Sequence, residues 1–344
     1  MSFFTIPYSA IQNNLKFSTN IKFVFLFILI LFSIEKIYGQ NYYFSRIFAD
    51  RLQTNPALTG STINPEININ HQSTVFNSEL LYSTYSFSYE NYIEALYGGV
   101  GFHLISCSQA QGTVIFTTAS LIYSYHTKIQ KDTKINYALS IAYNRFEINA
   151  NKLIFSDMIN PYSGVISSGS VEFREKYNTQ NIDFGTSAVL YSKKFHAGIS
   201  LKNSSNLFFK ENIHNFPPQL LLYFGKEYTF TAKNKKNDCK ITLIPIIGFG
   251  NTNKFRNIFA GTYVKKCVTG FGIYLKSNFF PNSYSGTFFV ELEISKKTAF
   301  SLAHERFFRT GNSISPGFYQ ISLRYKFPEK NKKSAIGTIY CNPF

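Results

Sequence analysis

Apolar and polar residues alternate with a period of two along most of the chain, which predicts β-strands with two chemically different faces. The clearest case is the segment 319–327 near the carboxyl end. One face of this segment carries Tyr319, Ile321, Leu323, Tyr325 and Phe327, and the other carries Gln320, Ser322, Arg324 and Lys326. In a transmembrane β-barrel the first face contacts lipid and the second face lines the lumen.

Similar runs predict about fourteen strands, an even number that suits a single-chain barrel. The strands are expected to begin near Glu66, Leu81, Tyr97, Val114, Ile135, Ile182, Phe195, Gln219, Ile241, Ile258, Val268, Gly286, Thr298 and Phe318. This spacing leaves room for the roughly 9 to 11 residues that a tilted crossing requires. The expected fold class is therefore all-β: a transmembrane antiparallel β-barrel over 66–327.

Short and long connections alternate along the chain between these strands. The short ones are 128–134, 191–194, 264–267 and 295–298, and the long ones are 147–181, 203–218, 276–285 and 307–317. In an even-stranded barrel with both termini in the periplasm, short turns lie on the periplasmic side. Lysines gather in these turns, so one rim is expected to be basic. Such a rim could bind an acidic partner, although turns that need solvated residues explain the lysines as well.

The amino-terminal segment has the pattern of a secretion signal. Lys16 and Lys22 precede an apolar run at 23–32, which is shorter than the roughly 20 residues that span a bilayer. Gly39 is a small residue at a plausible cleavage point. We therefore expect a signal peptide at 1–39, a periplasmic segment at 40–65 and a periplasmic tail at 328–344; an uncleaved anchor is the alternative.

Composition supports a membrane-embedded barrel. The chain has 37 Phe and 24 Tyr but only 16% charged residues. The net charge of +16 could suggest nucleic acid, but no aromatic-basic motif accompanies the lysines, so nucleic-acid binding is not expected. The cysteines Cys107, Cys239, Cys267 and Cys341 lack CxxC spacing, which argues against a zinc or redox site. We expect isolated cysteines, although an exported chain could form a disulfide.

No catalytic motif is supported once its residues are assigned to the predicted strands. Gly98, Gly99 and Gly101 superficially resemble a phosphate loop, but they lie in an alternating strand that no helix follows. Such glycines more readily relieve crowding or permit a bend. No HExxH or GxSxG pattern occurs. We therefore expect no enzyme activity, cofactor or metal, although a site built from scattered residues stays open.

Several segments resemble one family. The segment 43–61 is similar to the opening of the PorP/SprF outer-membrane proteins of Bacteroidetes, whose NPAxxGS motif falls on 55–61. It departs at Arg46, Ala49 and Asp50, where the family has Gln, Asn and Pro. Further similarities lie at 153–160 (LxFxDQI), 182–200 (FDxxxGLLYYSKKFYVGxS), 319–327 (HEISLxYxF) and 341–344 (CPRF). Their shared order covers nearly all of the expected mature chain.

The resemblance implies an outer-membrane β-barrel that works with type IX secretion and gliding motility. Some family members connect to the periplasmic ring of the translocon, and others help to export one large surface adhesin. The expected partners are therefore secretion components, an adhesin and membrane lipid. Candidate contact regions are 41–61, the basic turns and the tail 328–344. The candidate partner-binding residues are Asn55, Pro56, Gly60, Cys341, Pro343 and Phe344.

Two other readings remain open. A passive channel or transporter would use a lumen lined by Arg324, Lys326 and other polar residues to pass solutes, since a barrel of this size can be open or plugged. A soluble two-sheet sandwich that binds surface carbohydrate would also use alternating strands. Behaviour in detergent separates the sandwich from both barrels, and conductance separates the channel from the secretion accessory.

Overall fold

A computed structural model describes most of the predicted barrel region. The described residues are 44–62, 64–76, 79–130, 132–149, 152–153, 155–160, 162, 164–165, 177–205, 216–231, 240–252, 255–279, 283–308 and 317–328. All of them belong to the unit Tyr38–Phe344. The expected signal peptide at 1–39 and the candidate residues Cys341, Pro343 and Phe344 lie outside the described residues.

Antiparallel strands make up the wall. They are β1 (Glu66–Phe76), β2 (Glu79–Ile93), β3 (Gly98–Gln109), β4 (Val114–Gln130), β5 (Thr133–Ile148), β8 (Tyr177–Ser192), β9 (Phe195–Lys202), β10 (Gln219–Lys226), β11 (Tyr228–Thr231), β12 (Lys240–Thr252), β13 (Phe255–Lys266), β14 (Thr269–Asn278), β15 (Ser283–Glu293), β16 (Thr298–Phe308) and β17 (Phe318–Lys326). Two short strands, β6 (Ile159–Asn160) and β7 (Gly164–Val165), form a separate two-stranded sheet.

The remaining elements are single helical turns. They are α2 (Arg51–Thr54), η2 (Pro56–Leu58), η3 (Glu94–Leu96) and η5 (Ser156–Met158). Within the described part of the chain, no helix combines the length and the apolar character needed to cross a membrane.

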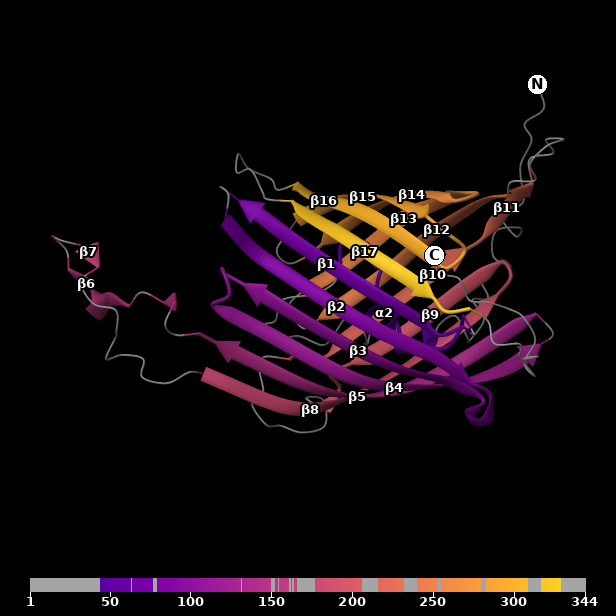
Figure 1. The fold of residues 1–344 in the computed structure, drawn as a ribbon, viewed down its shortest axis with the longest axis horizontal. Coiled ribbons are helices and arrows are strands. Elements are labelled where there is room, and N and C mark those ends of the chain that lie inside the picture. Colours follow the sequence, from indigo (N-terminus) through magenta and orange to yellow (C-terminus); the bar gives the residue numbers. More distant parts are fainter. Residues whose placement is uncertain are drawn as a thin grey trace, which may run out of the picture. The chain divides into compact units, whose positions relative to one another are not determined.

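The wall closes on itself. β10 and β11 form one strand interrupted at Glu227, because both pair with β12 in a single register, with Gly225 opposite Ile246 and Tyr228 opposite Leu243. The first and last strands also pair, with Glu66 opposite Lys326, and Figure 1 shows β1 and β17 side by side. The described residues thus form a closed antiparallel barrel of fourteen strands, which confirms the predicted fold. Every predicted strand start lies within a strand or one residue before it.

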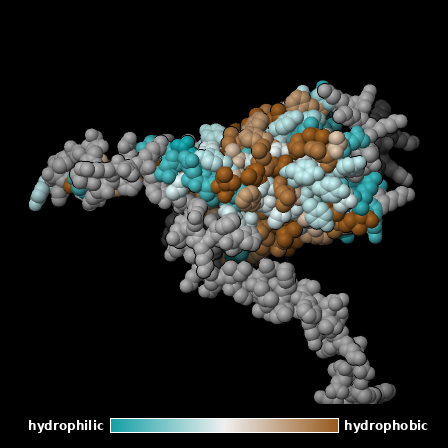
Figure 2. Space-filling view, turned by 90° about the horizontal axis from the view of Figure 1, so that it is seen from below, coloured by the Kyte–Doolittle hydropathy of each residue, from teal (hydrophilic) through white to brown (hydrophobic). Residues whose placement is uncertain are grey.

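The two faces of each strand differ as the alternation predicted. On β17, Ile321 and Leu323 are 47% and 39% exposed, whereas Gln320 between its apolar neighbours is only 2% exposed. Figure 2 shows hydrophobic residues over the middle of the wall and hydrophilic residues towards its ends. An apolar exterior with a polar interior is the arrangement that a lipid bilayer requires of a barrel.

The two ends of the barrel carry different connections. We call the end at Lys193 and Lys194, which alone join β8 to β9, the turn end. The opposite end, where 203–218 separate β9 from β10, is the loop end. Several connections depart from the predicted pattern. At the loop end only 77–78 separate β1 from β2 and only 253–254 separate β12 from β13, whereas at the turn end 232–239 separate β11 from β12.

The cysteines are not all isolated. Cys107 is free and buried on β3, whereas Cys267 is disulfide-bonded. The prediction of four isolated cysteines is therefore wrong for Cys267. Spacing along the chain could not show this bond, because a disulfide joins residues by their position in the fold.

Candidate functional site

The segment 44–62, which we call the plug, lies inside the barrel. Its side chains are buried almost throughout, and it contacts strands around the ring, from β1 and β2 through β8 and β9 to β15 and β17. The sequence predicted an N-terminal periplasmic segment at 40–65. The structure instead places the described part of that segment in the lumen, because its polar groups find their partners on the lumen-facing side chains.

Two capping residues give the plug its shape. The Asp50 carboxylate accepts a hydrogen bond from Gln53 N at 3.2 Å and begins α2. Asn55 accepts one from Ala57 N at 2.9 Å and begins η2, where Pro56 occupies the first turn. Asp and Asn are favoured at such positions because their side chains satisfy backbone N–H groups, and Pro suits the first turn because it has no N–H to satisfy.

Arg51 is the buried cation at the centre of the plug. Its guanidinium lies 3.6 Å from the Glu66 carboxylate on β1 and 3.4 Å from the Glu90 carboxylate on β2. It also donates hydrogen bonds to Ser61 Oγ and to Leu58 O. All three charged side chains are at most 2% exposed. Charges this deeply buried must be paired, so the plug and the wall depend on each other for neutralisation.

Arg46 makes a second charged contact. Its guanidinium donates to the Glu291 carboxylate on β15, and it lies 4.9 Å from the centroid of the Phe289 ring. Glu291 has another cation as well, since Arg324 on β17 donates to it at 3.0 Å. The Arg46 backbone N donates to the Gln320 side chain at 2.9 Å, which ties the same residue to β17.

Asp50 connects the plug to β2 and β3. Ser86 Oγ donates to its carboxylate at 2.5 Å, and His103 Nε2 lies 2.9 Å from the same oxygen. Burial alone would raise the pKa of the Asp50 carboxyl. The neighbouring His103 and the hydrogen bonds from His103, Ser86 and Gln53 outweigh burial and hold this pKa below its ordinary value.

Neutral contacts complete the fit. The Phe48 ring meets the Tyr223 ring edge-on, with the centroids 5.1 Å apart. Ser124 Oγ and Asn136 Nδ2 both donate to Ala57 O at 3.1 Å. Buried backbone carbonyls need such partners, so these contacts fix the path of the plug and not only its charge.

One close backbone approach depends on glycine. Gly60 has φ +70° and donates from its N–H to the Glu90 carboxylate at 2.6 Å. A Cβ on Gly99 of β3 would lie 2.2 Å from Thr59 O, which no real side chain tolerates. Of the three glycines that superficially resembled a phosphate loop, Gly99 and Gly101 thus admit the plug, whereas a Cβ on Gly98 would meet Ser124 O of β4.

The lumen wall has two contrasting regions. The charged wall comprises β15, β16, β17, β1 and β2, which bring Glu291, Glu305, Glu66 and Glu90 to the interior. The aromatic wall comprises β8 to β14, which bring buried rings of Tyr191, Tyr223, Phe259, Tyr263 and Tyr274 there. On the aromatic wall, rings lie over glycines of neighbouring strands: a Cβ on Gly248 would lie 2.2 Å from Phe259 Cζ.

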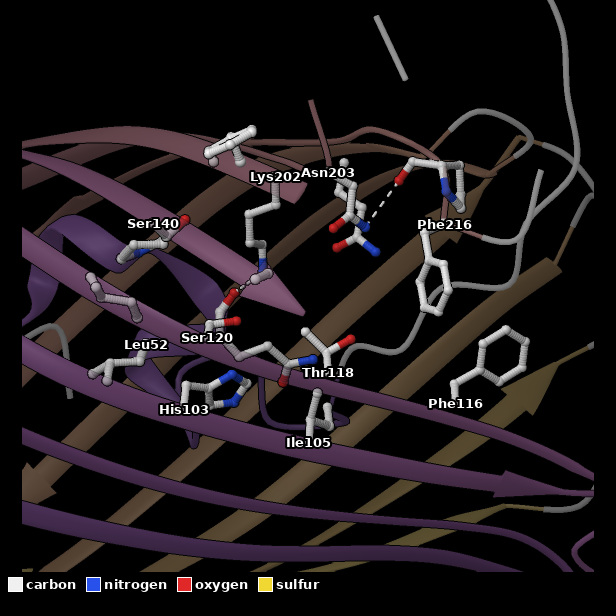
Figure 3. Close-up of a pocket in the computed structure, with 18 of the residues that line it drawn as sticks. Leu52, His103, Ile105, Phe116, Thr118, Ser120, Ser140, Lys202, Asn203 and Phe216 are labelled. Atoms are coloured by element: carbon white, nitrogen blue, oxygen red, sulfur yellow. Dashed lines mark hydrogen bonds between the residues drawn. The ribbon is translucent and has the colours of Figure 1, made fainter. Parts of the chain in front are cut away.

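A pocket lies between the plug and the loop end. Its floor is formed by Leu52, Gln53 and Pro56 of the plug. Figure 3 shows Thr118, Ser120, Ser140 and Lys202 among the other lining residues, which come from β4, β5 and β9. The cavity measures about 80 Å³. Lys202 Nζ donates to Gln53 O and so joins the pocket wall to α2. No cluster of three or more His, Cys, Asp or Glu side chains that could hold a metal occurs in the described ranges.

A comparison with protein families shows to which family this barrel belongs. Residues 37–325 match the family model described as type IX secretion system membrane protein PorP/SprF. The chain belongs to the PorP/SprF family. This confirms the resemblance found at the sequence level, and with the closed barrel it identifies a PorP/SprF protein that crosses the outer membrane many times. No curated protein matches the chain.

Solved structures similar to this PorP/SprF protein include barrels of low sequence identity. The outer membrane protein Omp33 of Acinetobacter baumannii is 8% identical, with a TM-score of 0.42, over 78% of this chain and 100% of that one. The CymD monoaromatic hydrocarbon channel is 10% identical, with a TM-score of 0.46, over 84% and 95%. The KdgM porin is 8% identical, with a TM-score of 0.35, over 76% and 99%. Nothing about the function of the present chain follows from these likenesses.

The structure brings three of the candidate residues of this PorP/SprF protein together. Asn55, Pro56 and Gly60 all lie in the plug, and Asn55 donates from Nδ2 to Ala188 O at 3.2 Å and to Ile199 O at 3.3 Å. Their described contacts are thus internal to the barrel. The sequence did not single out Arg51 or its carboxylate partners. A signal existed, because Glu66 and Glu90 occupy the polar face of alternating strands, where a buried carboxylate needs a cation.

Proposed function

We propose that this PorP/SprF protein is an outer-membrane accessory of type IX secretion and gliding, and not a solute channel. In this role it helps to export or to retain at the surface a large partner adhesin, or it connects to the periplasmic ring of the translocon. Both chain termini and the turn end face the periplasm, and the loop end faces outward.

The filled lumen is the observation that carries this proposal. Arg46, Asp50 and Arg51 bond to side chains of β15, β3, β1 and β2. A passive channel needs a continuous aqueous path, and buried ion pairs across the lumen oppose one. A barrel whose lumen holds part of its own chain supports a role in holding and presenting surfaces to partners.

Conductance tests the choice between accessory and channel. The purified full chain in a planar bilayer is expected to show no steady conductance, while the loss of one surface adhesin with unchanged solute uptake is expected when the gene is deleted. Large steady conductance of the unaltered chain, with normal display of surface adhesins in the deletion strain, would establish the channel instead.

We further assign the loop-end pocket to a segment of the secreted partner. The pocket presents hydroxyl groups beside apolar surface, which suits a peptide. Thr118→Phe fills the pocket, whereas Thr117→Phe on the same strand points outward by alternation and serves as the matched control. Loss of adhesin display with Thr118→Phe alone supports the assignment, and equal display with both variants contradicts it.

The turn end and the tail 328–344 are the proposed contact with the periplasmic machinery. The candidates Cys341, Pro343 and Phe344 belong to this contact, whereas Asn55, Pro56 and Gly60 act on partners only by holding the plug in place. Deleting 329–344 is expected to abolish co-purification of the periplasmic ring from membranes while the barrel keeps its heat-modifiable migration. Undiminished co-purification would remove the tail from the contact.

A further inference from the structure

The outer face of the barrel carries an apolar groove across β8, β9, β10 and β12. It measures about 630 Å³, and its lining includes Ala188, Leu190, Ala197, Ile199, Leu222 and Phe224. The groove exists because small side chains at Ala188 and Ala197 lie between larger ones. Ile199 and Phe224 are 46% and 48% exposed, so the groove opens to the outside of the barrel. In an outer-membrane protein this surface faces acyl chains.

Cations gather where the groove meets the turn end. Lys226 follows Phe224 by two residues on the same face of β10, about 7 Å further along the strand. Its ammonium lies 4.9 Å from the centroid of the Tyr228 ring. Glu227 N donates to Lys194 O at 2.6 Å, which places Lys194 beside Lys226 at one level of the wall. Lys193 in the same turn is paired with Asp132 at 3.0 Å.

We propose that this groove is a binding site for an anionic phospholipid. One acyl chain occupies the apolar groove, and the headgroup phosphate binds Lys194 and Lys226 at the membrane surface. The apolar groove suits an acyl chain and the lysines suit a phosphate. The groove lies where the acyl chains of a membrane lie, and the lysines lie at the level of the headgroups. A polar or basic peptide would leave the groove empty, and free phosphate would leave it equally empty. The inference is independent of the secretion role.

The first test alters the cations. The purified full chain in detergent is titrated with phosphatidylglycerol, and bound lipid is counted by native mass spectrometry. Lys194→Gln with Lys226→Gln is expected to weaken binding about fivefold per lysine. Lys296→Gln with Lys297→Gln, in the turn between β15 and β16, is the charge-matched control and is expected to leave this binding unchanged. Equal loss in both double variants would overturn the headgroup site.

The second test fills the groove. Ala197→Phe, or the smaller change Ala188→Leu where the first variant fails to fold, is expected to abolish tight lipid binding. Ala119→Phe on the outward face of β4 is the control, and heat-modifiable migration verifies that each barrel is folded. Unchanged lipid binding in the filled variants would overturn the proposal. So would competition by inorganic phosphate, which identifies a phosphate site without a lipid, or a dimer that Ala197→Phe dissociates.

Discussion

The charged wall and the aromatic wall enclose the same lumen but close it by different means. On the charged wall, Glu66, Glu90 and Glu291 bond to arginines that the plug supplies. On the aromatic wall, rings such as Phe259 pack over glycines of the wall itself. The charged wall thus depends on the plug for its neutralisation. The aromatic wall meets the plug through neutral contacts such as Phe48 with Tyr223, and rings of its own strands also pack into the lumen.

This difference shows which contacts hold the plug in the lumen and which contacts hold the strands of the barrel together. Removing one partner from a buried ion pair leaves an uncompensated charge, which is far more costly than losing an exposed pair. Changes on the charged wall should therefore release the plug. Changes on the aromatic wall should loosen the barrel and leave the plug in place.

Arg51→Met is expected to have the largest effect. It removes the guanidinium that lies 3.4 Å from the Glu90 carboxylate, while Glu66 retains Lys326 at 3.8 Å. Breaking a buried pair in this way costs about 3–5 kcal/mol. Hydrogen exchange in a plug peptide should accelerate accordingly, and the barrel should begin to conduct in a planar bilayer. Lys296→Met at the exposed turn end is the control, and similar exchange in both variants would show that Arg51 does not hold the plug.

Arg46→Met should have a smaller effect within the same wall. Glu291 retains a hydrogen bond from Arg324 at 3.0 Å and one from Tyr263 OH at 3.2 Å, so its charge stays compensated. Loss of one charged hydrogen bond costs about 1.5–3 kcal/mol. Plug exchange should rise less than in Arg51→Met. If Arg46→Met released the plug more readily than Arg51→Met, the ranking of the two charged contacts would be wrong.

Gly99→Ala tests the contact between the plug and the wall through steric overlap and not through charge. Its Cβ would lie 2.2 Å from Thr59 O, which forces the plug backbone to move, at a cost of about 1–3 kcal/mol. The matched change on the aromatic wall is Gly248→Ala, whose Cβ would meet Phe259 Cζ at 2.2 Å. We expect Gly99→Ala to accelerate plug exchange, and Gly248→Ala to lower the temperature of heat modification without affecting the plug. The same response in both variants would erase the distinction between plug and wall.

The sequence was sufficient to predict the strands of the wall, but it was insufficient to predict what occupies the lumen. Alternation predicts which side of a strand meets lipid, as at Gln320 and Ile321, because a period of two is a local property. The fourteen strands follow from repeating that pattern. The β10–β12 closure and the β1–β17 pairing then complete the ring.

The plug could not be predicted in the same way. Its two short helical turns give no periodic signal, and its contacts join residues far apart in sequence, such as Arg46 and Glu291. The family motif marked Asn55, Pro56 and Gly60 as important, but it assigned them to partners outside the barrel. Arg46 and Asp50, where the sequence departs from the family pattern, both bond to the wall. Arg51, which is not one of these departures, also pairs with the wall, so neither the motif nor the departures from it marked all the charged contacts.

Acidification should give the smallest effect, through Asp50. Its carboxyl has a pKa below the ordinary value of about 3.9, so the carboxylate stabilises the plug above that pH. This contribution is lost as pH falls through the lowered pKa of the folded protein. Other carboxylates titrate too, so the measurement is a difference: plug opening by conductance at about pH 5 and about pH 3 in the unaltered chain and in Asp50→Asn. The plug of Asp50→Asn should open more readily than the unaltered plug at about pH 5. Its conductance should rise less between about pH 5 and about pH 3, because the amide cannot titrate. An identical pH response in both proteins would mean that the bonds from Ser86 and His103 to Asp50 do not hold the plug.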